Sequence, residues 1–164
     1  MSRGFVPVLA AIAVAAAAGP PASVAQVNAP PSLDLRSPVA AEAASVVDAF
    51  HAALVRNDVR AALALLADDV LIFESGRVER SKAGYASHHA PADAAYAAAV
   101  PPSLQTRSAA ADDIYAWVVS ESQATGRYQD KPVDQLTTES MVLRKTRDGW
   151  RIAHIHWSSR PAPK

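Results

Sequence analysis

The sequence predicts an α+β domain in which helices precede an antiparallel sheet, and three observations support this class. Segments with a helical apolar period fill the first half of the domain. The second half holds four extended segments, at residues 103–112, 114–127, 133–145 and 150–159. Short turn sequences join the last three of these, as expected of neighbouring antiparallel strands. Helices followed by a run of strands are typical of an α+β fold.

The first 25 residues are expected to be a signal peptide and not part of the fold. Arg3 gives a basic start, residues 5–18 form an apolar run, and Ser23-Val24-Ala25 supplies the small residues of a cleavage site. This pattern predicts cleavage after Ala25 and a location in the periplasm or outside the cell. We further expect a flexible lead-in at residues 26–36, one domain at 37–159 and a tail at 160–164.

Composition narrows the chemistry that the chain can perform. The 164 residues include 16 Lys and Arg, 16 Asp and Glu, and no Cys. The absence of Cys excludes disulfides, thiolate metal sites and cysteine nucleophiles. The balanced charge gives no reason to expect a nucleic-acid partner, and no membrane partner is expected once the signal peptide is removed.

The helical half begins at Ser37-Pro38, an expected N-cap followed by proline in the first turn. An apolar stripe then predicts one long helix: Ala43, Val46, Val47, Phe50 and Leu54. Asn57-Asp58 is expected to end it and to cap a second helix, whose apolar side is Leu63, Leu65 and Leu66 and which Asp68-Asp69 stops.

A short buried strand is predicted at residues 70–74, ending near Gly76. Residues 77–80 are interpreted as a solvated loop that leads into a helix. Ser81 is expected to cap that helix, which runs to Ala90, and residues 92–99 continue helically up to Pro101-Pro102.

The two hairpin turns, near Asp130-Lys131 and at Asp148-Gly149, predict a register for the last three strands. It puts Ser120 opposite Met141, and Met141 opposite His156. Strand alternation then places His154 and His156 on the face that the helices cover. The predicted pocket residues are Glu74, His88, His89, Tyr96, Ser120, Glu139, Met141, Leu143, His154 and His156. The other face is expected to form a homodimer through Trp117, Val119, Val142, Ile155 and Trp157.

His51 is the one remaining histidine, and it is interpreted as a partly exposed helix residue. Several phrases of the sequence resemble the SnoaL-like branch of the nuclear transport factor two-like superfamily. They are residues 47–54 followed by Asn57-Asp58, residues 65–70, and Gly149-Trp150-Arg151-Ile152 leading to His156. The resemblance covers about residues 39–159. It implies a cystatin-like cone, in which a curved sheet wraps around helices and encloses a pocket, and frequent dimers through the outer face of the sheet.

Members of this superfamily include ketosteroid isomerases, cyclases, dehydratases and domains that bind without chemistry, so three functions stay open. The first is binding of a small molecule in a histidine-containing pocket, with no cofactor and with no catalytic turnover predicted. The second is an isomerase, lyase or cyclase with His156 or His154 as acid or base. The third is a zinc or copper site formed by His154, His156 and His88 or His89, with Glu74 or Glu139 as a further ligand.

Overall fold

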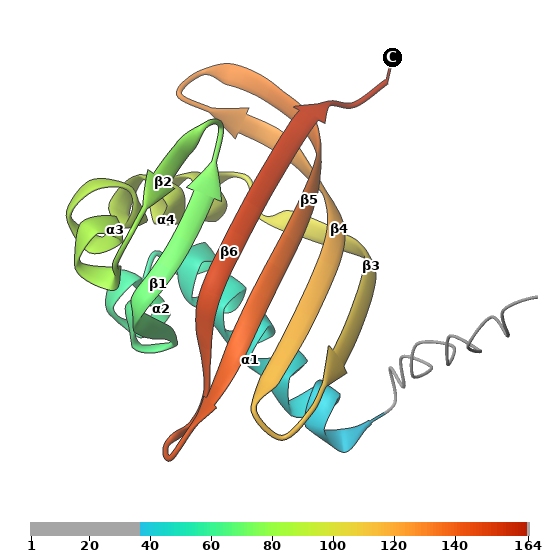
Figure 1. Ribbon diagram of the computed structural model, residues 1–164. Helices are drawn as coiled ribbons and strands as arrows, with labels where there is room; N and C mark the ends of the chain where they lie inside the picture. Colours follow the sequence, from blue (N-terminus) through green and yellow to red (C-terminus); the bar gives the residue numbers. More distant parts are fainter. Residues whose placement is uncertain (1–36, 164) are drawn as a thin grey trace, which may run out of the picture. The chain divides into compact units, whose positions relative to one another are not determined.

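The computed structural model describes residues 37–163, and the predicted signal peptide and lead-in lie outside this range. The described residues form four helices and six strands (Figure 1). The elements are α1 (Pro38–Val55), α2 (Val59–Ala64), β1 (Leu66–Glu74), β2 (Arg77–Glu79), α3 (Lys82–His88), α4 (Ala90–Ala99), β3 (Pro102–Ala111), β4 (Tyr115–Tyr128), β5 (Lys131–Thr146) and β6 (Gly149–Pro161). The α+β prediction is therefore confirmed.

All six strands belong to one sheet, in the order β2-β1-β6-β5-β4-β3. The four C-terminal strands form the predicted antiparallel meander, and β1 joins it in parallel alongside β6. This arrangement brings Glu74, at the end of β1, opposite Trp157 near the end of β6. Residues far apart in the sequence thus meet at one end of the sheet.

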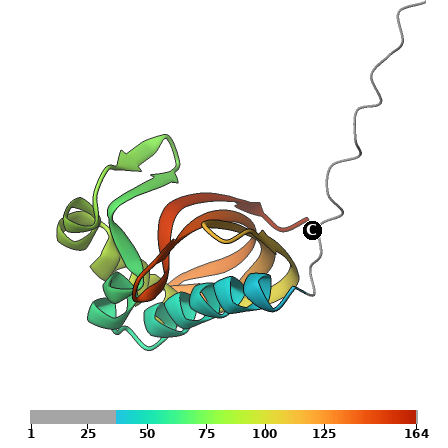
Figure 2. The same cartoon turned by 60° about the horizontal axis from the view of Figure 1, so that its bottom comes forward.

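The sheet curves over α1, which lies along its concave face (Figure 2). The predicted apolar stripe is the reason, because Ala43, Val47, Phe50 and Leu54 are all buried against the sheet. Helix α1 is long and apolar enough to span a membrane by length and composition, but its buried face forms the core of this domain. The helix begins at Pro38 as predicted, although the Ser37 side chain makes no capping bond.

Two predictions in the first half of the domain are wrong. Leu66, Asp68 and Asp69 belong to β1 and not to the end of α2, because the backbone pairing with Ile152 of β6 extends the strand toward its N-terminus. Residues 77–79 form β2 and not a loop. Ser75 and Gly76 both have positive φ angles, 49° and 76°, and so make a tight two-residue hairpin between β1 and β2.

The register of the first long hairpin differs from the prediction by two residues. Gln129 and Asp130 both have positive φ angles and form the turn themselves, so Ser120 pairs with Glu139 and Val118 with Met141. A shift of two leaves every side chain on its predicted face. The predicted face of Ser120, Glu139, Met141 and the rest of β5 is therefore retained.

The register of the second hairpin contains a β-bulge that the prediction did not include. Leu143 pairs with Ile152 but Val142 pairs with His154, so Ala153 has no partner on β5. A single extra residue reverses the faces of everything beyond it. Ile155 and Trp157 therefore face the helices, paired with Met141 and Glu139, while His154 and His156 lie on the outer face beside Val142 and Ser140.

Candidate functional site

Two adjacent cavities lie at the end of the concave face where β1 and β6 end. The larger has a volume of about 600 Å3 and the smaller about 330 Å3, and they share Glu74, Asp93 and Trp157 in their walls. Apolar atoms make up most of the surface of the larger wall, and nine of its 21 residues are apolar or aromatic: Ala92, Tyr96, Ala97, Val100, Pro102, Leu104, Ala124, Tyr128 and Trp157. The other twelve lining residues are polar or charged, so the cavity offers a small organic ligand both apolar surface and many polar partners.

Glu139 is the most buried charged group of the larger cavity, with 7% of its surface exposed. Its Oε2 accepts a hydrogen bond from the Trp157 indole at 2.7 Å and contacts His51 Nε2 at 2.8 Å. Burial alone would raise the pKa of Glu139. The His51 contact, the Trp157 hydrogen bond and the charge of Arg107 outweigh it, and the pKa lies below the usual value. Glu139 is therefore an ionised carboxylate at neutral pH.

His51 reaches this carboxylate from α1. The buried ring of Phe50 packs against two residues of the site. It contacts the His51 ring edge-on, at 5.7 Å between centroids, and stacks with the Trp157 ring at 6.4 Å. The imidazole of His51 keeps 27% of its surface exposed toward the cavity. One face of α1 thus anchors Phe50 in the core while the next residue presents its ring to the site.

A second polar group lies on the same wall. Arg107 of β3 donates from Nε to the Ser120 hydroxyl at 3.1 Å and forms an ion pair with Asp48 of α1. The Arg107 side chain is only 15% exposed. These bonds fix the guanidinium near Glu139 and connect α1 to the strands on which the cavity is built.

Two further carboxyl groups stand on the wall that both cavities share. Burial and the charge of Asp93 raise the pKa of Glu74, and burial raises the pKa of Asp93 although Tyr85 donates a hydrogen bond to it at 2.8 Å. Tyr85 is itself fully buried, and burial together with Asp93 raises its pKa far above the usual range. Glu74 and Asp93 therefore hold protons at a higher pH than ordinary carboxyl groups.

Replacing Asp93 by Asn is expected to raise the melting temperature by a few degrees at pH 7 to 8. The raised pKa of Asp93 means that the folded state binds its proton more tightly than the unfolded state, so this carboxyl destabilises the fold once it ionises. Asn keeps an acceptor for the Tyr85 hydroxyl and carries no charge. Thermal unfolding of both proteins checks this, and the difference should vanish near pH 4; an equal or larger gain there would contradict it.

Half of the predicted pocket residues line these cavities. Of the others, two are buried in the core and two are turned to the outer face by the β-bulge. Glu74, His89, Tyr96, Ser120 and Glu139 are in the walls. Met141 and Leu143 are fully buried in the core, and His88 is 67% exposed beside the small cavity. His154 and His156 lie on the outer face, so the prediction that they act in the pocket is wrong.

The same geometry separates the predicted metal ligands. His154 and His156 lie on the opposite side of the sheet from Glu139, and His154 contacts Phe73 at 5.5 Å between ring centroids. Among residues 37–163, no three histidine, aspartate or glutamate side chains are grouped to hold a metal ion. The outer-face prediction is corrected in the same way: Trp117, Val119 and Val142 lie there, whereas Ile155 and Trp157 face inward.

Sequence reasoning missed His51, Asp48, Arg107 and Asp93 as cavity residues. A signal existed for the first two, because Asp48 and His51 are three residues apart on α1 and so share a face beside the apolar stripe. Arg107 and Asp93 carry no comparable signal. Only the packing of β3 and α4 against α1 brings them to the site.

Comparison with known proteins places this geometry among related folds. The sequence profile of the SnoaL-like domain matches residues 43–163. A candidate ketosteroid isomerase from Shewanella frigidimarina is 39% identical, and the alignment covers 74% of this chain and 98% of that one, with a TM-score of 0.70. No curated protein matches the chain.

Two more distant structures agree in fold alone. A candidate dehydratase of the NTF2-like family from Streptomyces avermitilis is 19% identical, with 76% of this chain and 96% of that one covered and a TM-score of 0.63. The CaMKII hub of S. rosetta is 20% identical, with 74% and 96% covered and a TM-score of 0.62.

Proposed function

Since the chain belongs to the SnoaL-like domain family of NTF2-like proteins, we propose that it binds a small, mostly apolar carbonyl compound and that His51 transfers a proton on that compound. One observation carries the proposal. An imidazole held by a buried, ionised carboxylate faces a cavity that is apolar over most of its wall.

The carboxylate decides which nitrogen of His51 is free. An ionised carboxylate only accepts hydrogen bonds, so His51 Nε2, at 2.8 Å from Glu139 Oε2, carries the hydrogen of the neutral ring. The lone pair is then on Nδ1. A neutral histidine that a carboxylate orients in this way acts as a general base. Once the imidazole has taken a proton, the carboxylate stabilises its positive charge.

The cavity supports a ligand of matching character. A volume of about 600 Å3 suits a ring system of drug-like size. Apolar walls exclude water from most of such a molecule, while the polar wall around Glu139 and Arg107 gives its one polar group a place to bind. The 39% identical relative carries the name of a ketosteroid isomerase, an enzyme class that moves a proton next to a ketone.

His51→Gln is expected to slow proton transfer by about 100-fold or more, because general acid–base catalysis contributes that much. The probe is 2-tetralone, a bicyclic ketone that fits the larger cavity. NMR measures the rate at which its α-protons exchange in D2O. His156→Gln is the matched control, since it removes a histidine on the outer face. Equal losses in both variants, or no exchange above buffer in the unmodified protein, would contradict the proposal.

A ketosteroid tests whether the named activity of the relative is shared. The substrate is 5-androstene-3,17-dione, whose double bond is not conjugated with its ketone. Removing a proton next to the ketone and returning it two carbons further along conjugates the two groups, which ultraviolet absorbance detects. Exchange of 2-tetralone without this conversion would keep the proton transfer and reject the steroid as substrate.

We also propose that two copies of the chain form a dimer through the outer face of the sheet. The exposed apolar side chains on this face support the proposal. Tyr115, Phe73 and Val119 are 52%, 38% and 36% exposed on or beside this face. A dimer would remove them from water. Val119→Glu should convert a dimer into a monomer in light scattering, and a monomeric unmodified protein would overturn this.

A further inference from the structure

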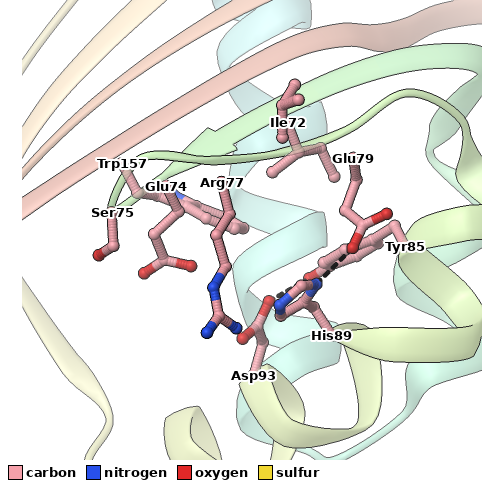
Figure 3. A pocket seen from close by; sticks show the side chains of 10 residues that line it. Ile72, Glu74, Ser75, Arg77, Glu79, Tyr85, His89, Asp93 and Trp157 are labelled. Carbon is pink, nitrogen blue, oxygen red and sulfur yellow. Dashed lines mark hydrogen bonds and ion pairs between the residues drawn. The ribbon is translucent and has the colours of Figure 1, made fainter.

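The small cavity contains a second histidine–carboxylate pair (Figure 3). His89 Nδ1 lies 2.5 Å from Glu79 Oε1, and the Glu79 side chain is only 15% exposed. The ring of His89 is 34% exposed and lines the small cavity together with Ile72, Tyr85 and Trp157. Its neighbour His88 is 3.6 Å from the same oxygen, too far for a hydrogen bond.

The space that Glu79 occupies depends on a glycine. A Cβ atom at Gly84 would lie 2.9 Å from Glu79 Oε2, closer than real Cβ contacts. Gly84 stands inside α3, where glycine is less favourable than alanine. The helix thus carries an unfavourable residue at the point where the carboxylate that holds His89 approaches it.

We propose that His89 is a second proton-transfer group, positioned by Glu79, that acts on the part of the ligand that enters the small cavity. The pairing mirrors that of His51 with Glu139 but uses the other ring nitrogen. Because Glu79 accepts from Nδ1, the lone pair of the neutral ring is on Nε2. This inference rests on the proposed function and adds to it a substrate class: carbonyl compounds long enough to occupy both cavities.

The proton balance needs no further reactant. His89 Nε2 takes a proton from a carbon next to the carbonyl, the electron pair of that C–H bond forms the new carbon–carbon double bond, and the π pair of the carbonyl group moves onto its oxygen. The resulting enolate takes the proton back from His89, at the same carbon or at another carbon that shares the charge. No electron enters or leaves the ligand, and His89 returns to its starting state.

The test compares the exchange, in D2O, of the protons next to the two ketones of 5-androstene-3,17-dione, a long ligand with a ketone at each end, in four proteins: unmodified, His51→Gln, His89→Gln and the double variant. We expect His51→Gln to keep exchange above buffer, and the added His89→Gln to reduce that remainder at least about tenfold. His88→Gln is the matched control and should change nothing. Gly84→Ala, which displaces Glu79, should lower the exchange as His89→Gln does.

The outcomes separate this inference from the proposed function. If the double variant exchanges as fast as His51→Gln alone, His89 takes no part and only His51 acts. If His89→Gln abolishes exchange while His51→Gln does nothing, the role of His51 is rejected and that of His89 stands.

The pair itself is tested without any ligand. Long-range proton–nitrogen NMR distinguishes the two neutral forms of a histidine ring, and His89 is expected with its hydrogen on Nδ1. Glu79→Ala should return it to the form with the hydrogen on Nε2. An unmodified His89 already in that second form would overturn the inference, whatever the exchange rates are.

Discussion

Replacing Glu139 by alanine is expected to destabilise the protein by about 3–5 kcal/mol, because it breaks a buried ionic contact and leaves its partners without an acceptor. The Trp157 indole and His51 Nε2 both bond to Glu139 Oε2, and the residue is 7% exposed. Proton exchange on 2-tetralone should fall to the level of His51→Gln at the same time, since nothing then orients His51. Urea unfolding measures the first effect and NMR the second.

Glu139→Gln is the matched variant, because it keeps the shape and one acceptor oxygen but loses the charge. Its loss of stability should be smaller than that of alanine and should depend on pH. The lowered pKa of Glu139 means that the folded state favours the ionised form, so the carboxylate stabilises the fold above the unfolded value of about 4.3. The difference between Glu139 and Gln should shrink as pH falls below that value. A difference that grows in acid would contradict the ionised assignment.

Phe50→Ala is expected to cost about 3–5 kcal/mol of unfolding free energy, the usual result of removing a fully buried aromatic ring. Phe50 is 0% exposed and contacts the rings of both His51 and Trp157. The cavity residues therefore lose their support along with the core. Phe73→Ala is the control, with both variants measured in the monomeric Val119→Glu protein, because Phe73 is 38% exposed on the outer face of a single copy. Equal losses in the two variants would show that the assignment of the two faces is wrong.

The class of fold could be predicted because the patterns that define it are local. The stripe from Ala43 to Leu54 predicts α1, and Asp58 and Ser81 cap their helices through the backbone N–H groups of Ala61 and Gly84 as their residue types favour. The bounds of β1 could not be predicted in this way. Leu66 is a strand residue only because β6 lies beside it, and no local pattern reports that contact.

The site was half predictable for a similar reason. Glu139 and Ser120 lie on their predicted face of the sheet because a register error of two residues keeps alternation intact. His154 and His156 were assigned wrongly because one unpaired residue, Ala153, reverses it. A bulge of this kind has no signature in the sequence here: Ala153 is neither glycine nor polar. His51 was passed over because its partner Glu139 is 88 positions away, and only the packing of α1 on the sheet brings the two together.

The most direct test of these assignments follows the ring resonances of the five histidines while 2-tetralone is added. We expect the signals of His51 to shift and those of His154 and His156 to stay unchanged, because the larger cavity and the outer face lie on opposite sides of the sheet. Shifts confined to His154 and His156, with His51 unaffected, would contradict the claim that the ligand site is the cavity built around His51 and Glu139.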